Sequence, residues 1–290
     1  MREATGAVCS SPFDVNSTDT LSRNPGQWQK FASCLRTLPA NSTAVYRLSN
    51  LLMPSPVDLA AVSEVVRDDV GLAAQVLKLA NLDLNEPTSD LDLALVYVGL
   101  DSLRTLLFTV PILENRDPMY ELWQHSAKCA KLCEWLARAT GCHSVKECYV
   151  AGLLHDLGRI PLLAWVGDNV LDVGDLTSFV YTAPQAEDAC LGINHQVVGG
   201  WLGVTWAFPD SLVEVLEHHH HPRTLSAAAL ERIVHAADVF CEFSAGKATF
   251  ASLSGALNLV SARNFQPPLA EQMCNLFGGN GECSTSNPKS

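Results

Sequence analysis

The chain has 290 residues, 48% of them hydrophobic, so it is long enough to bury a substantial core in one large or two small domains. Its formal net charge is -12 with only 19 lysines and arginines, which argues against a general binder of nucleic-acid phosphate backbones. No run of about 18 apolar residues and no apolar signal segment is present, so the sequence predicts a globular cytoplasmic protein and not a membrane-embedded or exported one.

The first half reads as a series of short helices. Residues 1–25 are polar, lack an apolar period and predict a flexible leader. Apolar residues three and four apart then predict helices over residues 27–38, 45–52, 59–66 and 70–79. Residues 91–98 fit a strand or a helix equally well. A stop and a new N-cap at residues 99–102 precede a helix over 103–110, and the proline-bounded segment 111–118 predicts the seam between two lobes.

The second half predicts longer helices that carry polar residues. The ranges are 119–140, 144–165, 186–202, 212–218 and 227–243, with weaker helices at 253–262 and 267–277 and a loose tail from 278. Ser144 and Glu147 have the spacing of a capping box. The helix over 186–202 contains three glycines, which indicates close approach by a neighbouring backbone. Because no alternating apolar stretch predicts a strand, the expected fold class is all-α.

Cysteine use favours reduced thiols. Ten cysteines would suit a disulfide scaffold in a short secreted chain, but this chain is long and apolar and has no export signal. Cys129 and Cys133 follow His125 at intervals of four, so the three share one helical face. That stripe either binds a metal or packs in the core, and packing is favoured because a free cysteine behaves as a small buried hydrophobe.

The segment AGLLHDLGRIPLL, residues 151–163, places His155 and Asp156 side by side in apolar sequence. Burying such a pair is unfavourable unless each group finds a partner. Local partners are one solution: a carbonyl for the histidine and a cap or ion pair for the aspartate. A zinc, manganese or iron ion is the other, since imidazole and carboxylate are ordinary ligands for these metals. The pair alone favours local partners.

Further polar residues interrupt the predicted helices of the second half. They are His125, His195, the run His218 to His221, and Asp238. If these helices form a bundle, such side chains can converge on one or two metal ions that lower the pKa of a bridging water for attack on a phosphoester. Spacing alone does not bring them together, so a metal site and a metal-free polar core both remain open.

Several motifs, in order, resemble the HDOD domain family. They are the LP-x5-V-x-R-L pattern at residues 38–48, VVRDDVGLAAQVLKLAN at 65–81, ALVYVGLDSLRTLL at 94–107, the AGLLHDLGRIPLL segment, E-x4-G-x2-H-x3-G at 187–199, and HHxP at 219–222. The resemblance implies an all-helical domain over residues 26–245. Its two lobes would be residues 26–115 and an HD-like lobe, residues 116–245, followed by a helical extension and tail over 246–290.

The resemblance also implies a set of metal ligands. The quartet of the HD superfamily maps onto His125, His155, Asp156 and Asp238. Further histidines of the HD-GYP branch, which hydrolyses cyclic di-GMP, are similar to His195, His219 and His220. The Gly-Tyr-Pro signature of that branch is replaced by HHHHPRTLSAAA, which argues against cyclic di-GMP hydrolysis.

HDOD domains are regarded as bacterial signalling modules, many with degenerate metal sites. The resemblance therefore favours a signal-transduction module that acts through a signalling protein partner, with a divalent metal (Fe, Mn, Zn or Ni, one or two ions) or a small nucleotide as ligand. The alternative is a metal-dependent phosphohydrolase acting on a nucleotide or cyclic dinucleotide. Arg104 and Arg159 are candidates for phosphate contacts, although a lone arginine is more often part of a surface ion pair.

Overall fold

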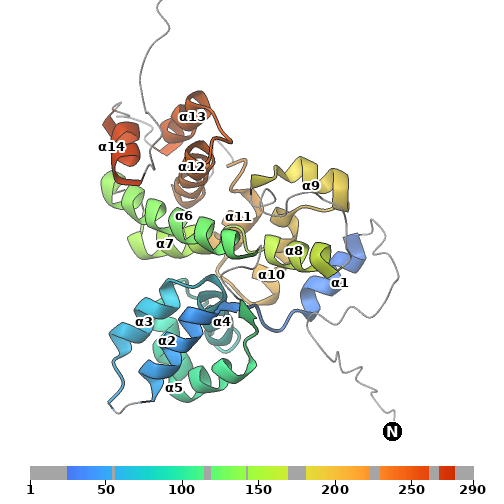
Figure 1. Ribbon diagram of the computed structural model, residues 1–290, viewed down its shortest axis with the longest axis vertical. Coiled ribbons are helices and arrows are strands. Elements are labelled where there is room, and N and C mark those ends of the chain that lie inside the picture. The colour runs from blue at the N-terminus through green and yellow to red at the C-terminus, as the bar shows by residue number, and fades with distance from the viewer. Residues whose placement is uncertain are drawn as a thin grey trace, which may run out of the picture.

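The computed structural model describes residues 25–53, 56–113, 119–141, 143–168, 181–222, 229–260 and 268–277. The expected leader, apart from residue 25, and the expected tail lie outside these ranges. Helices dominate them, which confirms the all-α class (Figure 1). The strands within them are β1 (Ala40–Asn41) and β2 (Ile112–Leu113), which pair in parallel. Two residues are too few to produce an alternating pattern, so the sequence did not predict them.

The N-terminal lobe consists of this strand pair and four helices, α2 (Ser42–Leu52), α3 (Leu59–Arg67), α4 (Val70–Asn81) and α5 (Leu91–Thr109). The helices start where side chains cap them. Asn41, Asp58, Asp69 and Asp90 each accept a hydrogen bond from a backbone N–H of the first turn. Residues 91–98 are helical, and α5 is kinked at Gly99, whose φ of 74° is the left-handed conformation that favours glycine.

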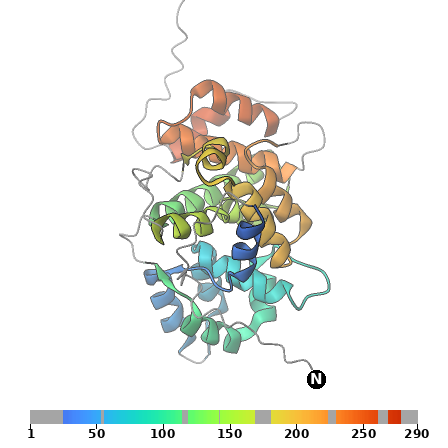
Figure 2. The same ribbon diagram turned by 90° about the vertical axis from the view of Figure 1, so that its right-hand side faces the viewer.

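The first helix, α1 (Pro25–Cys34), is shorter than expected and packs elsewhere. The prediction of a helix through residue 38 was wrong, because Leu35 and Leu38 are buried in the non-helical segment that follows Cys34. Both views place α1 beside α8 and α10, away from α2–α5 (Figures 1 and 2). Trp28 meets Trp165 edge to face there, with ring centroids 5.2 Å apart.

The second lobe contains the remaining helices. They are α6 (Met119–Thr140), α7 (Val145–Leu154), α8 (Arg159–Asp168), α9 (Pro184–Leu191), α10 (His195–Thr205), α11 (Asp210–His218), α12 (Ala229–Ser244), α13 (Phe250–Val260) and α14 (Pro268–Phe277). Helices α6 and α7 pack side by side, α12 packs on both, and α10 packs on α11. No described helix is long and apolar enough to cross a membrane.

Two predicted helices are each split in two. The range 144–165 is interrupted by a turn at residues 155–158, and 186–202 by Gly192, which has a left-handed φ of 74°. At Gly158 a β-carbon would lie 1.9 Å from the carbonyl oxygen of His195. The first turn of α10 therefore rests directly on the backbone of the 155–158 turn. The predicted close approach by a backbone is thus confirmed at Gly199, where a β-carbon would lie 3.6 Å from Gly158 N, whereas Gly192 ends α9 and Gly200 faces the Glu217 side chain.

The thiols are mostly buried and free. Cys129, Cys133, Cys148 and Cys241 are buried in the core and form no disulfide, which confirms the packing interpretation for Cys129 and Cys133. Burial raises the pKa of Cys129 to about 12, so this thiol stays protonated. Cys274 is disulfide-bonded, so the expectation of reduced thiols was wrong at that residue.

Candidate metal centre

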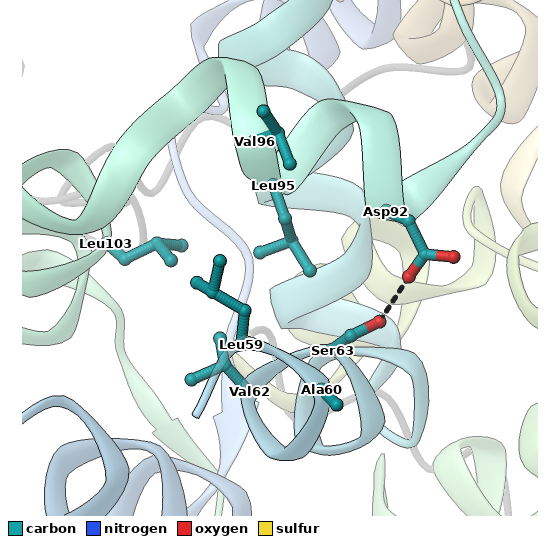
Figure 3. A pocket seen from close by; sticks show the side chains of 8 residues that line it. All are labelled: Leu59, Ala60, Val62, Ser63, Asp92, Leu95, Val96 and Leu103. Atoms are coloured by element: carbon teal, nitrogen blue, oxygen red, sulfur yellow. Dashed lines mark hydrogen bonds between the residues drawn. The ribbon is translucent and has the colours of Figure 1, made fainter. Parts of the chain in front are cut away.

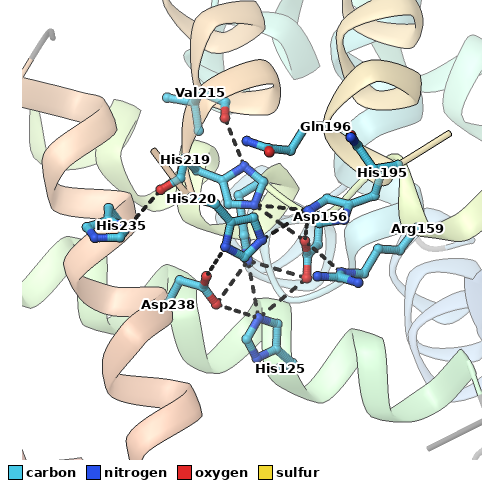
Figure 4. Close-up of polar contacts among 12 residues, drawn as sticks. His125, Asp156, Arg159, His195, Gln196, Val215, His219, His220, His235 and Asp238 are labelled. Carbon is cyan, nitrogen blue, oxygen red and sulfur yellow. Dashed lines mark hydrogen bonds and ion pairs between the residues drawn. The ribbon is translucent and has the colours of Figure 1, made fainter. Parts of the chain in front are cut away.

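Seven polar side chains from separate elements converge in the second lobe (Figure 4). They are His125 of α6, His155 and Asp156 of the turn after α7, His195 at the start of α10, His219 and His220 after α11, and Asp238 of α12. Apart from His220, none is more than 3% exposed. The structure thus brings together every residue expected as a metal ligand.

Four of these residues form what we call the quartet site. His125 Nε2 lies 3.2 Å from Asp238 Oδ1, 3.5 Å from Asp156 Oδ2 and 3.2 Å from His155 Nε2. His155 Nε2 lies 3.5 Å from the same Asp156 oxygen. Two imidazole nitrogens and two carboxylate oxygens therefore point at one position.

Asp156 also belongs to a second group, which we call the three-histidine site. Its Oδ1 lies 3.4 Å from His195 Nε2 and 3.6 Å from His219 Nε2. His195 Nε2 in turn lies 3.3 Å from His219 Nε2 and 3.1 Å from His220 Nε2. The two oxygens of Asp156 face different groups, so this carboxylate is shared between the sites.

The outer nitrogens of three imidazoles fix which inner nitrogens carry lone pairs. His155 Nδ1 donates to the Gly152 carbonyl at 2.8 Å, and His219 Nδ1 to the Val215 carbonyl at 3.0 Å. His195 Nδ1 donates to Glu187 Oε2 at 2.7 Å. When these three rings are neutral, each Nε2 carries a lone pair and accepts hydrogen bonds. The Nε2 atoms then face one another and the carboxylate oxygens at the centre. A cation between them resolves this arrangement, and such outer hydrogen bonds are typical of metal-binding histidines.

Residues 38–222 match the family model of the HDOD domain. The chain belongs to the HDOD family. This HDOD chain is 23% identical over 193 residues to an uncharacterized protein of Treponema pallidum (strain Nichols), covering 63% of this chain and 38% of that protein. It is 32% identical over 124 residues to the 3′3′-cGAMP-specific phosphodiesterase 1 of Vibrio cholerae, covering 41% of this chain and 28% of that protein. It thus spans about a third of the length of these curated relatives.

Solved structures support the fold of this HDOD chain. The MmoQ response regulator of Methylococcus capsulatus superposes with a TM-score of 0.64 at 18% identity, over 81% of this chain and 94% of that one. A virulence factor of Campylobacter jejuni superposes with a TM-score of 0.58 at 17% identity, over 83% of this chain and 99% of that one. At these identities the similarity shows a shared helical architecture.

Arg159 is part of the centre of this HDOD domain. The expectation of a surface ion pair was wrong, because Arg159 is 1% exposed. Its Nε lies 2.9 Å from Asp156 Oδ1, its Nη1 bonds Glu187 Oε1, and its Nη2 donates to the Thr182 carbonyl at 3.1 Å. Arg104, by contrast, pairs with exposed Asp101 at 2.8 Å, as expected of a surface arginine.

Glu187 was not among the expected site residues. Its carboxylate is buried, bonds Arg159, and accepts hydrogen bonds from both the backbone N–H and the ring of His195. It therefore orients a candidate ligand without facing the centre itself. The signal was present in the sequence, because Glu187 opens the E-x4-G-x2-H spacing that ends at His195.

The charges favour ionised carboxylates at the centre. Burial opposes ionisation of Asp156, but Arg159 and His155 hold its pKa well below its usual range. Burial likewise opposes ionisation of Asp238, whose pKa is held low by hydrogen bonds from His125 and His155. The buried centre therefore carries two negative charges from these aspartates, which one divalent cation would balance.

The imidazoles differ in protonation. Burial, followed by Arg159, lowers the pKa of His195 well below its usual range, and burial with His219 does the same for His220. Both are thus neutral, as metal ligands must be. Burial opposes a charge on His155, but Asp156 and a hydrogen bond to Asp238 raise its pKa well above the usual range. A proton on His155 would therefore occupy the position of a cation and compete with it.

Proposed function

We propose that this HDOD protein is a divalent-metal-dependent phosphohydrolase acting on a phosphoester of a nucleotide or cyclic dinucleotide. The observation that carries the proposal is the convergence of buried ligand atoms: the carboxylate oxygens of Asp156 and Asp238 and the inner nitrogens of oriented imidazoles lie close together at one centre. The donor set fits manganese, iron, zinc or nickel. When bound, the cation supplies a Lewis acid that activates water and polarises a phosphoryl oxygen.

The protein's own residues supply charge and orientation. Asp156 and Asp238 hold the negative charge that retains a cation, and Glu187 fixes the ring of His195 through a 2.7 Å hydrogen bond. Arg159 stays charged next to Asp156, because Asp156 and Glu187 outweigh the effect of burial and raise its pKa. Arg159 thus adds a fixed positive charge beside Asp156. The 3′3′-cGAMP-specific phosphodiesterase, 32% identical over the aligned 124 residues, supports cyclic dinucleotides as the first substrates to test.

The experiment uses protein purified without a metal column, because the run His218 to His221 would collect metal from it. Protein reconstituted with Mn²⁺ or Fe²⁺ is assayed against nucleotides and cyclic dinucleotides, alongside Asp156→Asn and Asp238→Asn. Removing a ligand should lower activity roughly 100-fold or more, the upper range found for outer-shell changes. Asp210→Asn, an exposed change on α11 outside the centre, is the matched control. Equal rates in all four proteins would mean that a contaminant is responsible.

The second candidate is a regulatory module that acts through a protein partner. It is favoured by apolar side chains on the N-terminal lobe, among them Phe108, Met53 and Val96, which are 91%, 84% and 72% exposed. An adjoining apolar groove of about 220 Å³ lies between α3 and α5 (Figure 3). It is lined mainly by Leu59, Val62, Leu95, Val96 and Leu103. Exposed apolar patches of this kind are typical of interaction surfaces.

This candidate predicts cross-linking to one specific protein in the native host from a photoreactive group at Val96, and none from exposed Glu86. It also predicts that metal-loaded protein turns over no phosphoester. Turnover that depends on Asp156, together with equal cross-linking from both positions, would contradict it.

A further inference from the structure

A third group of ligand atoms lies at the edge of the centre. Glu242 follows Asp238 by four residues on α12, so both carboxylates are on the same face of that helix. One ligand atom from each of His220, Asp238 and Glu242 lies within 4.8 Å of the others. We call this group the outer site, because His220 and Glu242 are partly exposed whereas the other ligands are buried.

Among the described residues, the carboxylate oxygens that face the outer site have no hydrogen-bond donor. Asp238 turns Oδ1 to the quartet site, while its buried Oδ2 has no hydrogen-bond partner and lies 3.6 Å from His220 Nδ1. Within the described part of the chain, no hydrogen bond or ion pair involves the Glu242 carboxylate. A cation would supply the positive charge that these two carboxylates lack.

We propose that His220, Asp238 and Glu242 bind a further divalent cation, distinct from one held by the quartet site. The site offers two carboxylates and one imidazole, a donor set richer in oxygen than the three-histidine site. Oxygen-rich sites suit Mn²⁺ or Mg²⁺, while imidazole-rich sites suit zinc, iron or nickel. The inference rests on the proposed function, since Asp238 serves both positions.

The charges distinguish the outer site from the three-histidine site. The anionic oxygen available to the three-histidine site is Asp156 Oδ1, and Arg159 Nε already lies 2.9 Å from it. A divalent ion there would add to the positive charge of a buried guanidinium. At the outer site, Asp238 Oδ2 has no such partner and Glu242 adds a second carboxylate. A hard cation therefore meets more negative charge at the outer site.

His220 couples the two sites. Its Nε2 lies 3.1 Å from His195 Nε2, and its Nδ1 lies 3.6 Å from Asp238 Oδ2. A neutral imidazole has one lone pair, so His220 serves either the three-histidine site or the outer site. Occupation of one weakens the other. Because Glu242 is partly exposed whereas His195 and His219 are buried, the outer site is the more accessible of the two.

The test is a titration of the full chain with Mn²⁺, in which electron paramagnetic resonance measures free Mn²⁺. Wild type is compared with Glu242→Gln, which keeps the shape and removes the charge, and with Glu214→Gln on α11, a half-buried residue outside every ligand group. His219→Gln removes a ligand of the three-histidine site but none of the outer site. Circular dichroism checks that each variant is folded. If Glu242→Gln does not fold, Glu242→Asp replaces it in the titration.

Wild type, Glu214→Gln and His219→Gln should each bind a second Mn²⁺ beyond the quartet ion. Glu242→Gln should lose the second Mn²⁺ or bind it at least roughly 10-fold more weakly. The double variant with Glu242→Gln and His219→Gln should show the same loss relative to His219→Gln. A second Mn²⁺ bound equally tightly with and without Glu242 would overturn the outer site and leave the quartet site intact. A wild type that binds no Mn²⁺ at all would overturn the proposed function together with the outer site.

Discussion

Each lobe buries carboxylates, but those of the two lobes have different hydrogen-bond partners. In the N-terminal lobe Asp69 is 1% exposed and caps α4, with Oδ1 accepting from Leu72 N at 2.8 Å. Its Oδ2 accepts from Asn41 N at 2.9 Å and from Trp123 Nε1 at 3.1 Å. In the second lobe Asp238 Oδ2 has no donor at all. A buried acid whose oxygens both accept hydrogen bonds therefore indicates a structural role, whereas a buried carboxylate oxygen without a donor, among other ligand atoms, indicates a bound ligand.

The pKa values follow the same division. Burial raises the pKa of Asp69 to about 6, although its N–H donors act to lower it. Asp156 is equally buried, yet Arg159 and His155 hold its pKa well below the usual range. Neutral N–H groups thus compensate less for burial than charged partners do. The N-terminal lobe uses its acid to join backbone segments, and the second lobe keeps its acids ionised.

Both acids are followed two residues later by a glycine without room for a side chain, which gives the strongest test of the comparison. A β-carbon at Gly71 would lie 1.9 Å from the Pro39 carbonyl oxygen, and one at Gly158 1.9 Å from that of His195. Gly71→Ala and Gly158→Ala should each lower the free energy of unfolding by about 3 kcal/mol or more, because backbone must move. Only Gly158→Ala should also weaken Mn²⁺ binding. Urea unfolding and Mn²⁺ titration measure the two effects.

Gly255→Ala on α13 is the matched control, since a β-carbon there meets open space. It should stabilise the helix by up to about 1 kcal/mol. If Gly158→Ala leaves Mn²⁺ binding unchanged, the contact between the 155–158 turn and α10 does not position the ligands.

The sequence predicted local features that depend on neighbouring residues. The helix starts at residues 59 and 70 and the bounds of α6 follow from the local sequence pattern, and the structure has them. The quartet was assigned through family resemblance, and its four members meet in space. These features need only short-range rules or a known pattern.

Features that depend on distant segments were missed. The apolar period continues through residues 155–158, but the chain turns there, where the carbonyl of His195 lies against Gly158. Arg159 was read as a surface residue because its partners Glu187 and Thr182 become neighbours only after folding. Glu242 carried no motif, and its position next to His220 depends on how α11 and α12 are joined. Periodicity describes one helix at a time and contains none of these contacts.

The pH dependence of stability tests the contrast between the acids. Because the pKa of Asp69 is raised from 3.8 to about 6 in the folded protein, its stabilising contribution is complete below about pH 3.8 and is lost as the pH rises through about 6. Relative to Asp69→Asn, metal-free wild type should lose about 2–3 kcal/mol of unfolding free energy between about pH 4 and pH 7. Urea titrations of both proteins measure this difference. A difference that instead grows with pH would show that the N–H donors outweigh burial.

Glu187 gives a smaller effect that concerns the second lobe alone. Glu187→Gln keeps the side-chain shape but removes the charge that faces Arg159 and the acceptor that orients His195. We expect Mn²⁺ affinity or phosphohydrolase activity to fall about 10-fold, as for other residues that orient metal ligands. Its pH profile should also shift, which a merely structural role would not cause. Asp188→Asn, an exposed neighbour, should change neither property.

The smallest effect is expected where the lobes meet at the surface. Lys146 of α7 lies 3.1 Å from Asp90 and 2.7 Å from Asp92 of α5, and its side chain is 56% exposed. Lys146→Met should cost less than about 1 kcal/mol, because water screens exposed ion pairs. The loss should vanish in roughly 1 M NaCl, where the Debye length is about 3 Å. Trp123→Phe, which removes the buried donor to Asp69, should cost about 1 kcal/mol at any salt concentration. If Lys146→Met costs more than Trp123→Phe, and the cost falls with salt, then surface charge holds the lobes together and the buried Asp69 contact does not.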